Sequence, residues 1–136
     1  MPLVHIHLIK GSFSRDQIKI IADSIQKTME SHFNAPPLNA PPRDRYQIIS
    51  QHEPYEIICE DTNLPGLPRS HKLIIVQIIQ QGRSAEVKQA AYAEIMRLLK
   101  ENVGLGDGDL IVSVAANTRE DWSFGAGRAQ FLTGEL

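Results

Sequence analysis

Cysteine and an excess of positive charge are what this chain most clearly lacks. Cys59 is its single cysteine, which excludes a disulfide within the chain and favours a reducing compartment. The 14 basic residues stand against 16 acidic ones, so the formal charge is −2, and no block of lysine or arginine is present. A nucleic acid or an anionic membrane surface is therefore not the expected partner.

Long apolar runs and targeting segments are also missing. No apolar stretch approaches the roughly 20 residues that a membrane-spanning helix needs. The first residues show neither the basic segment nor the long apolar core of a secretory signal. We therefore expect a cytoplasmic protein without membrane association, folded as a single domain over residues 1–136, a length that supports an ordinary hydrophobic core.

A proline directly follows the initiator methionine. Removal of Met1, which is usual before proline, would leave Pro2 with a free secondary amine, which is both a base and a nucleophile. A retained Met1 would instead turn that nitrogen into an amide without basicity. Pro2 opens the alternating apolar run of residues 2–9, which is typical of a β-strand. Because a strand holds its first residue in a fixed position, the amine can form part of a site.

The first half of the chain predicts a strand followed by a helix. The strand covers residues 3–9. Ser14 and Gln17 then form a capping-box pattern, and apolar residues at helical spacing predict a helix to about His32.

The second half repeats this arrangement. The near-continuous apolar run of residues 73–79 predicts a strand that is buried on both faces. A Gly-Arg-Ser turn at residues 82–84 follows, with Ser84 suited to the N-cap of a second amphipathic helix that ends near Gly104. Residues 110–115 predict a further strand.

Two strand–helix–strand units predict an α/β fold: one four-stranded, mostly parallel or mixed sheet with both helices on one face. The other face of the sheet would carry apolar side chains without cover. Another subunit is the simplest cover, so we expect an oligomer.

Three segments carry no clear helical pattern. Asn-Ala-Pro-Pro occurs twice between residues 34 and 42, and this proline-rich duplication predicts a stiff surface loop. Residues 52–71 are rich in turn formers and contain one short strand-like piece at 57–59. From Asn117 onward the chain is predicted to be loop-like.

Several motifs, spread over essentially the whole chain, resemble one known family. They are Pro2-Leu3, Asp44-Arg45-Tyr46-Gln47, Ser50-Gln51-His52, Glu60-Asp61-Thr62, Gly82-Arg83-Ser84, Asp121-Trp122-Ser123-Phe124-Gly125 and the tail from Phe131 to Leu136. On these motifs the chain resembles the tautomerase superfamily and, within it, the malonate semialdehyde decarboxylase group. The resemblance implies the fold expected above, assembled as a homotrimer and working without a cofactor.

The resemblance also implies roles for three residues. Pro2 would be the catalytic amine, acting as a cation that polarises the substrate carbonyl or as an imine that accepts electrons. Arg83 would hold the substrate carboxylate, and Asp44 would orient Pro2 or a water. Taken alone, Asp44 also suits a solvated turn, and Arg83 a polar helix start. A bound anion would explain why a cation stands at a helix N-terminus, where it is otherwise mildly unfavourable.

Aromatic and amide side chains complete the predicted substrate site. Trp122 and Phe124 would form an apolar wall that favours loss of neutral CO2, and a subunit interface also suits them. Tyr46 either flanks the site or begins a strand. Gln81 stands where some members of the family carry a second arginine, so the grip on the carboxylate is weaker or differently arranged.

The predicted reaction is decarboxylation of a small 3-oxo acid, malonate semialdehyde, to acetaldehyde and CO2. Keto–enol tautomerisation of a pyruvoyl or phenylpyruvate-like acid is the alternative, and it requires a neutral Pro2. Hydration or dehalogenation of a 3-substituted acrylate is related to both, and a trimeric binding module without catalysis belongs to another class. His5 and His7 share one strand face, but two histidines without a third ligand do not predict a metal site.

Overall fold

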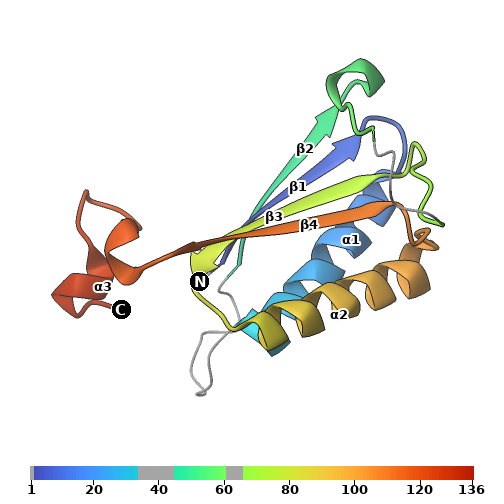
Figure 1. Cartoon of the computed structure of the whole chain (residues 1–136). Coiled ribbons are helices and arrows are strands. Elements are labelled where there is room, and N and C mark those ends of the chain that lie inside the picture. The colour runs from blue at the N-terminus through green and yellow to red at the C-terminus, as the bar shows by residue number, and fades with distance from the viewer. Residues whose placement is uncertain (1, 34–44, 61–65) are drawn as a thin grey trace.

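The computed structural model describes residues 2–33, 45–60 and 66–136, which form a four-stranded sheet and two long helices (Figure 1). The strands are β1 (Leu3–Ile9), β2 (Tyr46–His52), β3 (Ile74–Gln81) and β4 (Leu110–Asn117). The helices are α1 (Arg15–Thr28), the π-helical turn η1 (Met29–Phe33), α2 (Ala85–Val103) and α3 (Gln130–Thr133), with 3-10 turns η2 (Pro54–Glu56) and η3 (Arg119–Asp121).

The sheet is mixed, with the strand order β2-β1-β3-β4. β1 and β2 are parallel, as are β3 and β4, whereas the central strands β1 and β3 are antiparallel. Each parallel pair is connected through one long helix, and both helices lie on the same face of the sheet (Figure 1). The predicted pair of strand–helix–strand units is therefore confirmed.

The helix ends follow the local signals in the sequence. The Ser14 hydroxyl accepts a hydrogen bond from the Gln17 N–H at 3.2 Å, and the Gln17 side chain accepts one from the Ser14 N–H at 2.9 Å. α2 begins after Ser84, whose hydroxyl accepts from the Val87 N–H, and it ends at Gly104 in the left-handed conformation, with φ at 67°. These bonds satisfy backbone groups that a helix start leaves unpaired.

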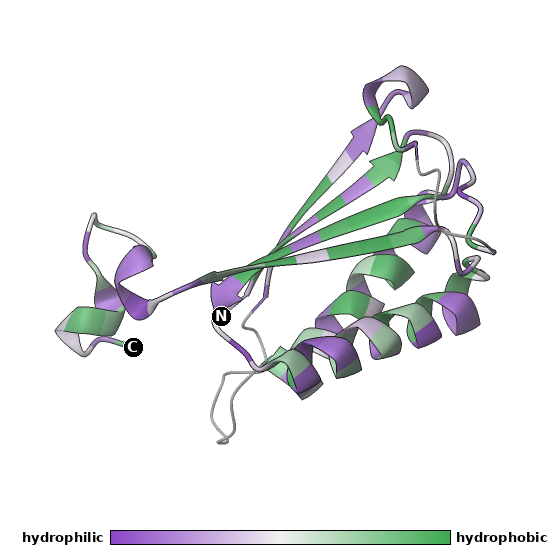
Figure 2. Ribbon diagram, viewed as in Figure 1, coloured by the Kyte–Doolittle hydropathy of each residue, from purple (hydrophilic) through white to green (hydrophobic). Residues whose placement is uncertain are grey.

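The core fills the space between the sheet and the two long helices. Alternate residues of β1 and β3 point into it, and Figure 2 shows apolar residues concentrated along these strands. Fully buried apolar side chains of this core include Val4, Ile6, Leu8, Ile21, Ile25, Ile74, Val76, Ile78, Ile95 and Leu99. Their removal from water is the main favourable contribution to folding.

The second sheet face carries apolar side chains that neither long helix covers. Ile48 on β2 is 48% exposed and lies beside His5 of β1 in the register of the sheet. Further half-buried apolar side chains on this face are Leu3, Ile75, Ile79 and Ile111. The uncovered face that the sequence predicted is thus present in the part of the chain that the structure describes.

The segment after β2 and the C-terminal tail differ from the predictions. Residues 57–59 form no strand, and Ile58 is 76% exposed, because β-branched composition makes a strand only where a neighbouring strand pairs with it. The strand that precedes this segment is β2, and it begins at Tyr46, which is one of the two roles considered for that residue. The tail is largely irregular, as predicted, but it also contains η3 and the short helix α3.

Several predictions concern residues outside the described ranges or properties that the fold does not test. Asp44 and the duplication at residues 34–42 lie outside the described residues. Within the described ranges, no helix is long and apolar enough to cross a membrane. The cytoplasmic location stays a prediction.

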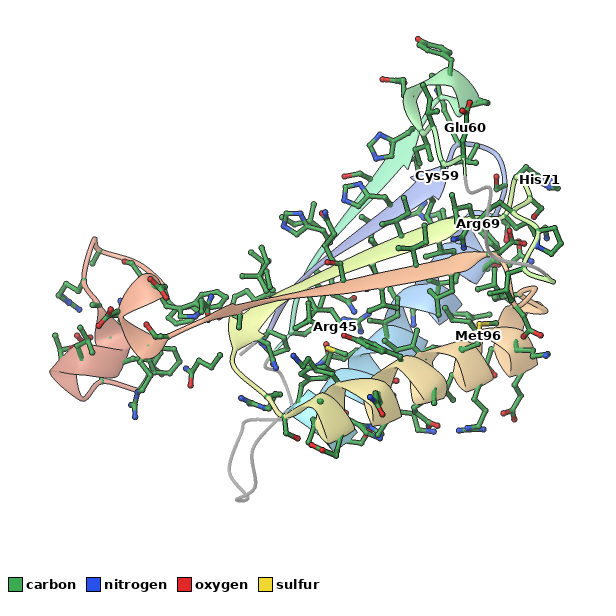
Figure 3. The ribbon with its side chains drawn as sticks, viewed as in Figure 1. Arg45, Cys59, Glu60, Arg69, His71 and Met96 are labelled. Carbon is green, nitrogen blue, oxygen red and sulfur yellow. The ribbon has the colours of Figure 1, made fainter. Side chains whose placement is uncertain are left out.

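Gly108 lies where the chain before β4 passes against the chain before β3. A β-carbon at this position would stand 2.0 Å from the Pro68 carbonyl oxygen, which belongs to the backbone. Hydrogen bonds hold the two segments together: the Arg69 guanidinium donates to the Gly108 carbonyl at 2.7 Å, and the Asp109 carboxylate accepts from the Ser70 N–H at 2.6 Å. Arg69 lies at the end of the sheet away from the N-terminus (Figures 1 and 3).

We predict that Gly108→Ala lowers the free energy of unfolding by about 2–3 kcal/mol, because two backbone segments must move apart to admit the methyl group. Urea unfolding at matched protein concentration measures this loss. Gly106→Ala is the control, since the nearest atom to its β-carbon is the Asp109 carboxylate oxygen at 3.4 Å. Equal losses in the two variants would contradict the prediction.

Candidate functional site

The strand directions bring several segments to one end of the sheet. β1 and β2 begin at this end, and β3 and β4 finish there, because they run antiparallel to β1 and β2. Pro2 is buried at the start of β1, between the start of β2 at Tyr46 and the end of β3 at Gln81. α2 begins at Ala85, shortly after β3 ends at Gln81. We call this region the Pro2 end of the sheet.

Gln80, which the sequence analysis missed, shares the face of the sheet on which Pro2 lies. Leu3 pairs with Ile79 across the antiparallel strands, so the next position of the register places Pro2 opposite Gln80. Gln80 is 1% exposed, and among the residues that the structure describes its Nε2 has no hydrogen-bond partner. Gln81, which the sequence analysis singled out, points to the other face and pairs in register with Asn117 of β4.

A signal for Gln80 was present in the sequence. Residues 74, 76 and 78 point into the core, and Gln80 continues this two-residue period with a polar side chain. The apolar run of residues 73–79 predicts a strand buried on both faces, and a strand of that kind gives no reason to single out one face at Gln80.

Arg83 lies between β3 and α2, and its side chain connects the end of β3 to the end of η1. Its Nη2 donates to the Phe33 carbonyl at 2.5 Å, and its Nη1 donates to the carbonyls of Gln81 and Gly82 at 3.1 and 3.0 Å. The Phe33 carbonyl ends η1, where unpaired carbonyls carry partial negative charge. A guanidinium has five N–H donors, so these three bonds leave donors for an anion.

An aromatic cluster forms between the tail and the start of β2. The rings of Trp122 and Phe124 are stacked, with centroids 5.4 Å apart and planes 3° apart. Phe124 also contacts Tyr46, at 5.9 Å between centroids, and the edge of Phe131, at 5.4 Å. The Trp122 Nε1 donates to the Asn117 side chain at 3.0 Å, which fixes the indole to the end of β4. The structure thus brings together three aromatic residues of the predicted site and adds Phe131.

Arg45 is a second cation near the start of β2, but it is paired with α1 (Figure 3). Its Nη1 lies 2.8 Å from the Asp23 carboxylate, and Lys19 lies 2.6 Å from the same carboxylate. The hydrogen bonds from Lys19 and Arg45 lower the pKa of Asp23 from its ordinary value. Arg45 also donates to the Gln47 side chain at 2.9 Å. Its charge is therefore directed to α1.

Histidines gather on the uncovered sheet face. His7 Nδ1 lies 2.9 Å from His52 Nε2, and His7 Nε2 lies 3.2 Å from Gln77 Oε1. Since the Gln77 oxygen can only accept, His7 donates through Nε2 and His52 donates to its Nδ1 when both rings are neutral. His5 lies beside His7, with ring centroids 6.3 Å apart. Within the described ranges, no group of three His, Cys, Asp or Glu side chains is arranged to hold a metal ion.

Two grooves are lined by described residues. One, of about 530 Å³, runs between α1 and β2 and is lined by Lys19, Arg45 and Ile49 among others. The other, of about 480 Å³, lies between α1 and α2. Neither includes Pro2 or Arg83, so the candidate site rests on the chemistry of the Pro2 end.

Comparison with known proteins gives consistent results. A family model described as tautomerase enzyme matches residues 44–125. The probable tautomerase YrdN of Bacillus subtilis (strain 168) is 38% identical over 138 residues, which cover 100% of both chains. A malonate semialdehyde decarboxylase, whose structures were described as a basis for decarboxylase and hydratase activities, is 38% identical, with a TM-score of 0.86 over 98% of each chain.

A more distant structure bears on the fold alone. A fused 4-OT, described as a symmetric trimer, is 17% identical, with a TM-score of 0.69 over 92% of this chain and 95% of its own. The sheet and helix arrangement is thus shared beyond close relatives. From the match to the family model and the full-length similarity to YrdN, the chain belongs to the tautomerase family.

Proposed function

We propose that this protein decarboxylates a small 3-oxo acid, malonate semialdehyde, to acetaldehyde and CO2. The observation that carries the proposal is the placement of a buried Pro2 and of Arg83 at one end of the sheet. The whole chain is also similar to a malonate semialdehyde decarboxylase. No cofactor takes part in this proposal.

The residues at the Pro2 end have complementary roles in this reaction. Arg83 binds the carboxylate with the donors that its backbone contacts leave over. Pro2, as a cation or as an imine, draws electrons toward the substrate carbonyl. When the bond to the carboxylate carbon breaks, its electron pair moves toward that carbonyl and CO2 leaves. The resulting enol or enamine then takes up a proton. On the imine route, the water lost when the imine forms is added back, which releases acetaldehyde and frees Pro2.

We propose that two further groups support the reaction. Trp122 and Phe124, with Tyr46, offer an apolar wall, which disfavours the charged carboxylate relative to neutral CO2. Asp44 is proposed to orient Pro2 or a water, on the basis of its motif with Arg45 and Tyr46. Gln81 remains a proposed contact at the rim, from the open face of the sheet.

Keto–enol tautomerisation of a phenylpyruvate-like acid is the second candidate. Similarity to a probable tautomerase favours it, and it uses the same amine and the same anion site. Hydration of a 3-substituted acrylate is a third reaction of this site, and the related decarboxylase is described with a hydratase activity. A binding module without catalysis would have no use for a buried proline amine.

We also propose a homotrimer. The uncovered sheet face exposes Ile48 and other apolar side chains, which a second and a third copy would cover. Trimers are described among the structures that share this fold.

A paired assay of the wild-type protein tests the proposed reaction. One arm supplies malonate semialdehyde and measures acetaldehyde; the other supplies the enol of phenylpyruvate and measures ketonisation. Acetaldehyde release supports the decarboxylase. Ketonisation alone would assign the protein to the second candidate, and no reaction in either arm would favour the binding module.

The pH dependence of kcat/KM discriminates between the two states of the amine. A free α-amine titrates near pH ~7.7–8.0, and its surroundings move this value. If cationic Pro2 is the active form, kcat/KM falls as the pH rises through the pKa of Pro2. If neutral Pro2 is the base, kcat/KM rises over the same interval. For decarboxylation we predict the fall, and a rise would contradict the cationic role.

A further inference from the structure

Gln80 holds a buried hydrogen-bond donor that the described part of the chain leaves without a partner. Within the described ranges, two buried side-chain atoms lack a partner: Gln80 Nε2 and His5 Nε2. His5 lies on the uncovered sheet face, whereas Gln80 is 1% exposed on the face that the helices cover. Most buried polar groups in native proteins are paired, so an unpaired amide at a candidate site indicates a missing partner.

The position of Gln80 identifies the surroundings of that partner. The antiparallel register places Gln80 opposite Pro2, and Ala116 of β4 flanks it on the other side. Arg83 follows three residues later, with its guanidinium bound to the end of η1. The Gln80 amide therefore lies next to Pro2, the proposed catalytic amine, on the strand that leads directly to Arg83, the proposed anion site.

We propose that Gln80 is a substrate-binding residue whose Nε2 donates a hydrogen bond to the carbonyl oxygen of the bound oxo acid. The inference rests on the proposed function and deepens it. An amide N–H matches an oxygen acceptor, and Arg83 already accounts for the carboxylate. Because the amide is neutral, it can lie beside a cationic Pro2 without repelling it, which a second arginine could not.

The same contact would also promote the reaction. The carbonyl oxygen gains negative charge as the electron pair of the breaking bond moves toward it. A donor that is already oriented in a water-excluded place stabilises this charge more than it stabilises the substrate. Gln80 therefore acts mainly on kcat, whereas Arg83 acts on substrate binding.

Gln80→Met tests the inference, because methionine has a similar length and no donor. We expect kcat/KM for malonate semialdehyde to fall about 10- to 100-fold, mostly through kcat. We also expect the melting temperature without substrate to stay the same or to rise, because an unpaired buried amide is removed. Gln89→Met, an exposed position on α2, is the matched control and keeps the wild-type kcat/KM.

The outcomes separate this inference from the proposed function. Turnover by the wild type that Gln80→Met leaves unchanged overturns the inference alone. A melting temperature that falls together with kcat/KM also overturns it, because the amide then supports the fold. If the wild type converts only the phenylpyruvate enol, the proposed decarboxylation fails, and the same two variants decide the inference with that substrate. A wild type that is silent on both substrates overturns both.

Discussion

Pro2→Ala is expected to lower kcat for the oxo acid by about 10³-fold while the fold is retained. The physical reason is the pyrrolidine ring of proline. It holds the secondary amine in one orientation, which the start of β1 fixes relative to the sheet. The primary amine of an N-terminal alanine rotates freely, and a small misplacement of a reacting group already costs about 10²-fold. Steady-state assays with malonate semialdehyde measure the effect.

Two controls make this result interpretable. Intact mass establishes that Met1 is removed from both proteins, since a retained methionine would convert the nitrogen into an amide and silence the wild type as well. Melting curves establish that loss of the buried proline ring leaves the fold in place. Wild-type turnover by the variant, with Met1 removed, would refute the catalytic role of Pro2 and favour a binding module.

Arg83→Ala is expected to lower kcat/KM by about 10²-fold, mainly through a higher KM, because the substrate carboxylate loses its charged partner. The same substitution should lower the free energy of unfolding by about 1 kcal/mol. The Phe33 carbonyl loses the Arg83 Nη2 donor, which lies 2.5 Å away in the wild type. Substrate titration and urea unfolding measure the two effects separately.

Arg83→Lys is the matched variant for this prediction. Lysine keeps the positive charge but cannot form two parallel hydrogen bonds, so we expect a kcat/KM between those of the wild type and Arg83→Ala. If both variants lose stability and keep the wild-type KM, Arg83 serves only to hold η1, and another group binds the carboxylate.

The sequence predicted the elements whose signals are local. Ser14 and Gln17 form the capping box at the start of α1, and Gly104 ends α2, because helix ends depend on a few neighbouring residues. The alternation of residues 3–9 predicted β1, because a two-residue period is likewise a property of neighbouring residues. The strand predicted at residues 57–59 was wrong. Strand propensity describes how well a side chain fits into a sheet, and no described strand pairs with these residues.

The sequence by itself determined the family, through motifs from Pro2 to the tail, and with it the chemical groups proposed for the site. Only the tertiary structure decided which side chains share a face: Gln80, and not Gln81, lies opposite Pro2, and Arg83 reaches Phe33, fifty positions away along the chain. The physical reason is that strand register reverses the face of every side chain when it shifts by one residue. That register is set by contacts between β1 and β3, which lie far apart in the sequence and become neighbours only in the folded sheet.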